Sequence, residues 1–476
     1  MNKNLFLVTI FTILSMVCGT ANAQYQIKIH IDNLADSTIY LGYYFGDKQY
    51  VKDTVVLDKK ANGVFEGKDS LPGGIYFIVV PGNMMFELIV DKDQKFSLST
   101  KYSKNPVDLT KWLKVSGSDD MQIYIDYQQY MTHQGELAMG LRKRLKNTSN
   151  TEKETKEIQD SLNLLNDQVQ AKWKEIEEKY PKSLIASVLF CIKEIDIPEP
   201  PRDSNGVITD SMFQYRYYKK HYFDYVDFSD ERLLRTQFYH PKIDRYFDKL
   251  VVPAPDSVIK ESKMVLEKAS ANPEVFKYTL QIIFNKYNNS EIMGMDKVFV
   301  FLAENYYLNG KANWTDTTWL KKVQERVDEL KPNLIGEQAP ELKLIGYDNS
   351  LVSLYMINAD YTVLFFFEPS CGHCKKATPK MKVLSDKYMD KGVVVLGIYT
   401  QVDHEEWKKF IEEQHLENWI NAWDPYNQSH FRDNYDVRST PTIYLLDKDK
   451  KIIGKRIDVE TLEKMLEDEF KKKEKK

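Results

Sequence analysis

The feature that most constrains this chain is a pair of cysteines that follows a run of apolar residues. Tyr361–Phe367 is a continuous apolar run with the length and aromatic content of a buried strand. Glu368 and Pro369 break this run, and the sequence from Gly372 onward is typical of a helix. Cys371 is therefore expected at a helix N-terminus, where unpaired N–H groups and the helix dipole favour a negative charge.

The second cysteine, Cys374, lies about one helical turn after Cys371. The thiolate is the form of cysteine that attacks a disulfide. A second thiol at this spacing can resolve the mixed disulfide by closing a ring with the first. His373, when protonated, would add a positive charge beside the Cys371 thiolate. The motif predicts two-electron dithiol chemistry, with Cys371–Cys374 as a redox-active disulfide.

Two other interpretations of the pair remain open. Two cysteines at this spacing are also half of a zinc site. However, the chain holds no second pair of this kind, and His404 and His430 lack the spacing of zinc ligands. The pair could instead be structural or inactive. We expect the dithiol chemistry, with no metal and no cofactor.

The cysteine motif resembles the active-site helix of the thioredoxin superfamily. The matching residues are Cys371, Gly372, His373, Cys374, Lys375 and Pro379. Downstream, Tyr435–Asp447 resembles the second signature of that superfamily, in which a cis proline faces the cysteine pair. Pro441 is the matching position, so the resemblance implies a cis bond after Thr440. It also implies a catalytic role for Pro441 and substrate binding by Thr440 and Pro441, because the backbone at such a bond can pair with an incoming peptide.

A third stretch, Ile335–Leu344, resembles the segment that leads into redoxin-branch domains. The three motifs occur in the right order. Residues 334–476 therefore resemble the thioredoxin-like α/β domain of exported thiol:disulfide interchange proteins of bacteria.

The chain departs from these relatives near the cysteines. Plain thioredoxin has a buried acid where this chain has Phe365, and some cytochrome-maturation members have a glutamate where this chain has Ala377. Glu368 is either the proton acceptor for Cys374 or a solvated loop acid. A peroxiredoxin is not expected, because Glu368 occupies the position at which that family has Thr or Ser.

Residues 1–23 have the pattern of a secretory signal peptide. Lys3 supplies the charge, Leu5–Val17 the apolar core, and Ala21–Ala23 a small-residue cleavage site. Lipidation at Cys18 is the less favoured alternative. No later apolar run is long enough to span a bilayer. We therefore expect cleavage after Ala23 and a periplasmic protein, in a compartment where disulfides form and persist.

A chain of 476 residues is expected to form two or three domains. Residues 24–115 hold short apolar runs separated by turn residues, which predict an antiparallel β-sandwich. Residues 118–330 predict an all-α domain, in which Cys191 lies on an apolar helix and is expected to be a buried thiol. With the thioredoxin-like domain at 334–476, the fold class is multi-domain α+β.

Two functions follow from these patterns. The first is an exported protein-disulfide oxidoreductase whose partners are protein substrates with disulfides or thiols. His373 favours an oxidising pair, whereas the family resemblance implies a reductant supplied by a membrane electron donor. The second is an envelope interaction protein whose thioredoxin-like domain is structural or accessory. The net charge of −4 gives no reason to expect nucleic-acid binding.

Overall fold

A computed structural model describes residues 23–147 and 150–474. Cys18 and nearly all of the predicted signal peptide lie outside the described residues. The chain divides into two compact units, one ending at Arg245 and the other beginning at Tyr246. Across the described ranges, no helix combines the length and the apolar composition that crossing a membrane requires.

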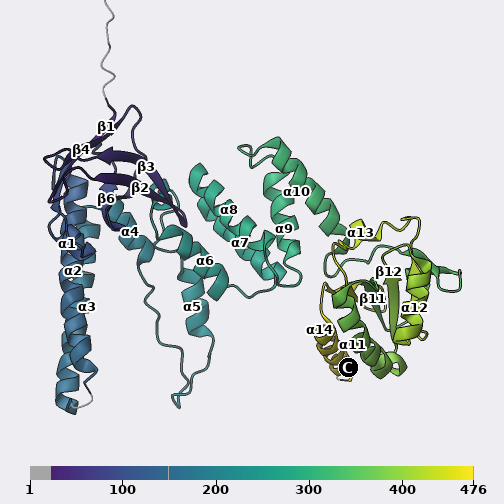
Figure 1. Cartoon of the computed structure of the whole chain (residues 1–476). Helices are drawn as coiled ribbons and strands as arrows, with labels where there is room; N and C mark the ends of the chain where they lie inside the picture. Colours follow the sequence, from purple (N-terminus) through teal and green to yellow (C-terminus); the bar gives the residue numbers. More distant parts are fainter. Residues whose placement is uncertain (1–22, 148–149, 475–476) are drawn as a thin grey trace, which may run out of the picture. The chain divides into compact units, whose positions relative to one another are not determined.

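The first unit begins with two four-stranded sheets, with the strand orders β4-β1-β7-β8 and β3-β2-β5-β6. Strands of both sheets are labelled in Figure 1. The strands are β1 (Tyr25–Asp32), β2 (Thr38–Phe45), β3 (Lys48–Val56), β4 (Asn62–Gly67), β5 (Gly74–Val80), β6 (Met84–Val90), β7 (Lys95–Lys101) and β8 (Lys114–Ser116). The predicted N-terminal β architecture is confirmed. One detail differs: β1 pairs with β7 in parallel, whereas the other pairs of these sheets are antiparallel. Pairing between strands that are distant in sequence cannot be seen in a pattern of short apolar runs.

Strand β1 shows why these residues form a half-buried sheet. Tyr25, Ile27, Ile29 and Ile31 are buried, and the residues between them are more exposed. Side chains of a strand alternate between its two faces, so one face of β1 contributes to the core.

Helices follow the sheets of the first unit. They are α1 (Pro106–Lys111), α2 (Asp119–Leu145), α3 (Glu152–Lys179), α4 (Leu184–Ile192), α5 (Phe213–His221) and α6 (Tyr239–Lys249), which crosses into the second unit. The long helices α2 and α3 lie side by side (Figure 1), and the Tyr130 hydroxyl donates to the carbonyl oxygen of Gln168 at 3.1 Å. Thr151 and Glu154 form a capping box that satisfies free N–H groups at the start of α3.

The second unit also begins with helices. They are α7 (Pro255–Ala269), α8 (Pro273–Asn288), α9 (Asp296–Leu302) and α10 (Thr317–Leu330), with a π-helical turn at Ala303–Tyr307 and a 3₁₀ turn at Lys331–Asn333. The helical character predicted for the centre of the chain is therefore confirmed. The domain limits 24–115, 118–330 and 334–476 stay predictions, because the two compact units divide within the helical region.

A seven-stranded sheet with the order β10-β9-β13-β12-β11-β14-β15 completes the second unit. The strands are β9 (Lys343–Gly346), β10 (Leu351–Ser353), β11 (Tyr361–Phe367), β12 (Val393–Tyr399), β13 (Ile420–Trp423), β14 (Thr442–Leu446) and β15 (Ile452–Lys455). The helices are α11 (Gly372–Tyr388), α12 (His404–Gln414), α13 (Phe431–Asn434) and α14 (Val459–Glu474). Strands β11, β12 and β13 are parallel, and β14 runs antiparallel to β11. The predicted thioredoxin-like α/β fold is confirmed.

Strand β11 lies inside this sheet and is buried on both faces. Val363, Phe365 and Phe367 pack in one core with residues of α11, α12 and α14. Leu364 and Phe366 pack in a second core on the opposite face. A strand covered on both sides gives the loop at its carboxyl end a rigid base, and the cysteine pair follows that loop.

Candidate active site

Cys371 caps the N-terminus of α11, directly after the loop that leaves β11. Its backbone is extended, with φ of −73° and ψ of 123°, and its carbonyl oxygen accepts the Lys375 N–H at 3.1 Å. The unpaired N–H groups of the first helical turn therefore point toward the cysteine motif. This is the placement that the sequence predicts for Cys371.

The Cys371 thiol is partly exposed and contacts the second predicted motif. Its Sγ donates to the carbonyl oxygen of Thr440 at 3.2 Å. Burial by itself opposes ionisation of Cys371. Hydrogen bonds to the sulfur from the backbone of Cys374 and from the Thr440 side chain outweigh burial, so the pKa of Cys371 lies below its usual value.

Cys374 lies on the same helix but in a different environment. Its side chain is 0% exposed. Burial raises the pKa of the Cys374 thiol to about 12, and its contact with Cys371 acts in the same direction. Both thiols are free in this structure, so the arrangement is that of the reduced pair. The two sulfurs are thus unequal: Cys371 is partly exposed and has a lowered pKa, whereas Cys374 is buried and has a raised pKa.

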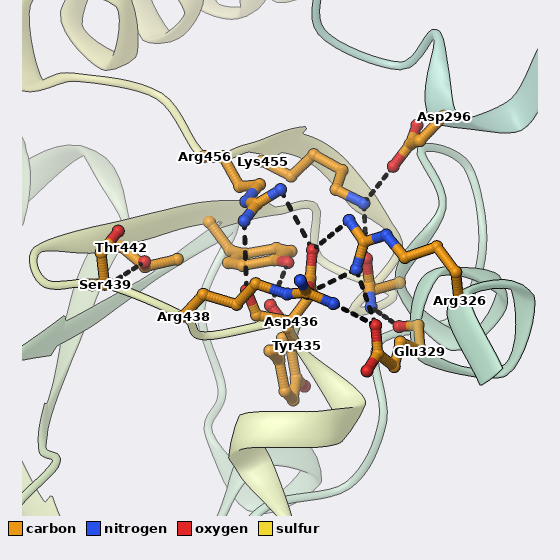
Figure 2. Close-up of polar contacts among 12 residues, drawn as sticks. Asp296, Arg326, Glu329, Tyr435, Asp436, Arg438, Ser439, Thr442, Lys455 and Arg456 are labelled. Atoms are coloured by element: carbon orange, nitrogen blue, oxygen red, sulfur yellow. Dashed lines mark hydrogen bonds and ion pairs between the residues drawn. The ribbon is translucent and has the colours of Figure 1, made fainter. Parts of the chain in front are cut away.

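The proline motif lies opposite the cysteines, as the resemblance implies. The peptide bond between Thr440 and Pro441 is cis, which confirms that expectation. The Thr442 hydroxyl donates to the carbonyl oxygen of Ser439 at 2.6 Å, which ties together the two sides of this loop (Figure 2). The loop enters β14, whose residues are all buried.

A groove with a volume of about 590 Å³ runs beside the cysteine pair. His373, Thr440 and Pro441 all line it, so the structure brings together three of the residues that the sequence nominated. His373 itself is exposed. Arg456 and Lys376 also line the groove, although no sequence motif marked either of them as a site residue.

Glu368, for which the sequence left two roles open, makes two hydrogen bonds at the loop before the cysteines. Its carboxylate accepts a hydrogen bond from the side-chain amide of Gln401 at 2.6 Å. The carbonyl oxygen of Glu368 accepts the Cys371 N–H at 3.3 Å. Both hydrogen bonds stabilise the conformation of the loop.

Within residues 23–147 and 150–474, no group of three or more histidine, cysteine, aspartate or glutamate side chains could hold a metal ion.

A cluster of charged residues at the base of the proline loop was not found from the sequence. Asp436 is buried there and contacts Arg326, Arg438 and Arg456 (Figure 2). Asp436 belongs to the second motif, but Arg326 lies 110 residues earlier in the chain. No local pattern links two residues at that separation.

Three protein families match three successive regions of the chain. The AhpC/TSA family model matches residues 335–455. Two families described as domains of unknown function match the preceding regions: DUF5106 at residues 145–333 and DUF4369 at residues 25–124. The C-terminal match covers both the cysteine motif and the proline motif.

Curated relatives align with the C-terminal region. The thiol-disulfide oxidoreductase ResA of Bacillus cereus is 28% identical over 131 residues, which are 28% of this chain and 74% of that protein. ResA of Bacillus anthracis has the same identity and coverage.

Solved structures that resemble this chain are matched over almost their whole length. A domain of a possible thiol-disulfide isomerase from Cytophaga hutchinsonii is 38% identical, with a TM-score of 0.29, and covers 30% of this chain and 99% of that chain. A thioredoxin-like protein from Bacteroides caccae is 22% identical, with a TM-score of 0.44, and covers 58% of this chain and 98% of that chain. Both TM-scores are too low to carry an argument about the whole chain.

One continuous region of the chain carries the family match. The same region holds the seven-stranded sheet, the cysteine pair at the start of α11 and the cis bond before Pro441. Residues 335–455 form a thioredoxin-like domain of the AhpC/TSA family, and regions that match DUF4369 and DUF5106 precede it.

Proposed function

We propose that this chain is an exported protein-disulfide oxidoreductase that acts as a reductant through Cys371 and Cys374. The observation that carries the proposal is the inequality of the two thiols. Cys371 is accessible at a helix N-terminus and its pKa is lowered, whereas Cys374 is buried and its pKa is raised to about 12. A nucleophile and a protected resolving thiol are the two parts that disulfide exchange requires. The names of the relatives support the same class of reaction.

The proposed reaction proceeds in two exchange steps. The Cys371 thiolate attacks one sulfur of a substrate disulfide, forms a mixed disulfide and expels the other substrate sulfur as a thiolate. Cys374 then loses its proton and attacks Sγ of Cys371. This step forms the Cys371–Cys374 disulfide and releases the second substrate sulfur. Two electrons and the Cys374 proton pass from the pair to the substrate, and the second substrate thiolate takes its proton from solvent.

The proton of Cys374 has an acceptor in this sequence of steps. The substrate thiolate expelled in the first step is a stronger base than a carboxylate by about four pKa units. The carboxylate of Glu368 is already bound to Gln401. We therefore assign the proton to the leaving substrate thiolate and not to Glu368.

Thr440 and Pro441 are proposed to bind the peptide around the substrate disulfide. The carbonyl oxygen of Thr440 already accepts a hydrogen bond from the Cys371 thiol at 3.2 Å, so backbone groups of this loop lie beside the reacting sulfur. An extended peptide that pairs with this backbone would present its disulfide to Cys371. The adjoining groove, lined by His373 and Pro441, has room for flanking side chains.

His373 is proposed to assist by charge. It is exposed beside the groove, and its ring when protonated would stabilise the Cys371 thiolate and the expelled substrate thiolate. Because it is solvent-exposed, we expect its contribution to be smaller than that of the helix N-terminus.

The proposed location is the periplasm. The signal pattern at residues 1–23 supports export, with cleavage after Ala23 favoured over a lipid anchor at Cys18. A reductant in an oxidising compartment has to be supplied with electrons, so a membrane electron donor of the dithiol class is the proposed partner.

Trapping of the mixed disulfide tests the proposed reaction. In a Cys374→Ala variant, the complex between Cys371 and a client protein cannot be resolved. We expect high-mass species on non-reducing gels that disappear when dithiothreitol is added. The matched Cys371→Ala variant should form none. Equal amounts of complex in both variants, or none in either, would contradict the proposal.

The redox state of the pair in cells tests the direction. Acid-quenched cells are treated with a thiol-specific mass tag, and the shift of the protein is read on a gel. A pair that is mostly reduced identifies a reductant. A pair that is mostly oxidised would make the protein a disulfide donor. If Cys371→Ser instead retains full biological activity, the interaction-protein alternative holds.

A further inference from the structure

Asp436 is a buried carboxylate in the turn that leads into the Thr440–Pro441 loop. Its side chain is 1% exposed. Its backbone has a φ of 45°, a left-handed conformation that aspartate tolerates better than most residues. A carboxylate in such a place is costly unless it is paired and hydrogen-bonded. Its partners therefore determine how firmly this turn is held.

Three arginines surround the Asp436 carboxylate (Figure 2). Arg326 makes a bidentate contact, with its two terminal nitrogens at 2.8 and 2.9 Å from the two carboxylate oxygens. Nε of Arg438 lies 2.7 Å from Oδ1 of Asp436, and Nη1 of Arg456 lies 3.0 Å from Oδ2 of Asp436. Burial alone would raise the pKa of Asp436, but the arginines hold it below its usual value.

The bidentate partner comes from the helical segment. Arg326 lies on α10, whereas Arg438 and Arg456 belong to the thioredoxin-like domain. Glu329, on the same helix, contacts Arg326 at 2.9 Å and also contacts Arg438. Arg456 lines the groove beside the proline loop. Helix α10 is thus linked to the loop and, through Asp436, to a wall of the groove.

A second buried link joins the same two segments. Lys455, with a side chain that is 3% exposed, donates to the Asp296 carboxylate on α9 at 2.5 Å and to the side-chain oxygen of Asn333 at 2.5 Å. The Asn333 amide in turn donates to the carbonyl oxygen of Asn434 at 3.0 Å. The chain before the proline loop and the end of β15 are therefore both held by residues that precede the thioredoxin-like domain.

We propose that α10 positions the substrate-binding loop through the Arg326–Asp436 ion pair, which makes the preceding helical segment a working part of the site for protein substrates. Arg326 and Asp436 are positioning residues, because they act through the loop and not on the reacting sulfur atoms. The proposal rests on the proposed disulfide exchange. A bidentate pair is directional, and its loss leaves the turn free to adopt other conformations.

The two kinds of disulfide substrate depend differently on this loop. A protein substrate has to pair with the loop backbone, so a mobile loop adds an ordering cost to each encounter. A small disulfide needs only access to Sγ of Cys371. The proposal therefore predicts a selective loss of reaction with protein disulfides.

The experiment compares two substrates in the full-length protein. The reduced protein, freed of reductant, is mixed with insulin or with cystine, and the rate of formation of the Cys371–Cys374 disulfide is followed. We expect Arg326→Met to lower the rate constant with insulin about tenfold and to leave the rate constant with cystine unchanged. Arg326→Lys, which keeps the charge but not the bidentate contact, should restore part of the loss.

Matched variants make the result decisive. Lys322→Met removes a positive charge from an exposed position on the same helix and should change neither rate. Asp436→Asn should reproduce the selective loss. A wild-type rate with insulin in Arg326→Met, or an equal fall with both substrates, overturns the positioning role. If the wild-type protein reacts with neither substrate, the proposed function itself fails.

Discussion

Helices α11 and α4 each carry cysteine, but they give the thiol opposite properties. Cys371 stands at the N-terminus of α11, is partly exposed, and has a pKa below its usual value. Cys191 stands near the C-terminal end of α4 and is 0% exposed. Burial raises the pKa of the Cys191 thiol to about 11, although the charge of Lys242 acts in the opposite direction. We therefore expect the same side chain to react as a nucleophile at Cys371 and to be inert in the core at Cys191.

A lowered pKa of a cysteine thiol in this chain requires two conditions together, a helix N-terminus and access to solvent. A helix N-terminus offers N–H groups to a negative charge, whereas a helix C-terminus offers carbonyl oxygens that repel it. Position along the helix is not sufficient, because Cys374 belongs to the first turn of α11 and burial still raises its pKa to about 12. Among the three cysteines that the structure describes, only Cys371 combines the helix end with access to solvent.

The largest expected effect is on activity. Cys371→Ser should lower the rate of insulin reduction, measured with dithiothreitol as electron donor, by roughly 1000-fold or more. A serine hydroxyl is not ionised at neutral pH and cannot form a disulfide. Cys191→Ser makes the same chemical change in α4 and should retain the wild-type rate. Activity that is retained in Cys371→Ser, or lost in Cys191→Ser, would contradict the expected difference between the two cysteines.

The next effect is on chemical reactivity. Below pH 9, a thiol with a pKa of about 11 has roughly 100-fold less thiolate than one at the ordinary value of 9.0. The pKa of Cys371 lies below 9.0, so its thiolate fraction rises at lower pH than that of a free cysteine. We expect iodoacetamide to label Cys371 in the native protein at least about 100-fold faster than Cys191.

Mass spectrometry of peptides labelled between pH 6 and pH 9 measures this difference. Cys374 should follow Cys191 and become reactive only in denaturant. The contrast is wrong if Cys191 is labelled as fast as Cys371. It is also wrong if labelling of Cys371 reaches half its maximum at a higher pH than labelling of a free cysteine peptide.

The smallest effect is on stability. Cys191→Ala removes a fully buried sulfur and should destabilise the first unit by about 1–2 kcal/mol, because a small cavity remains in the core. Cys371→Ala removes a partly exposed side chain and should change stability by less than about 0.5 kcal/mol. Urea unfolding midpoints of the two variants test this order. Equal shifts would show that burial does not distinguish the two positions.

Local patterns in the sequence were sufficient for the elements around the cysteines. The apolar run Tyr361–Phe367 forms β11 with the same limits, because a strand buried on both faces needs apolar side chains at every position. Cys371 lies at the helix start that the break after Phe367 predicts. The cis bond at Pro441 followed from the resemblance of a motif.

Long-range partners were not available from such patterns. The parallel pairing of β1 with β7 joins residues on either side of five other strands. The Glu368 carboxylate is bound by Gln401, and no local pattern favours that partner over the Cys374 thiol. Contacts of this kind depend on how the elements pack, which short windows of sequence do not encode.

The amino-acid sequence alone places a dithiol motif at a strand-to-helix junction, because strand, break and helix start are local features of the backbone. The tertiary structure adds the unequal environments of the two thiols, since burial raises the pKa of Cys374 but is outweighed at Cys371 by hydrogen bonds to its sulfur. Only the tertiary structure brought Arg326 to Asp436. Burial and ion pairing depend on residues that are far apart in the chain and meet only after it has folded.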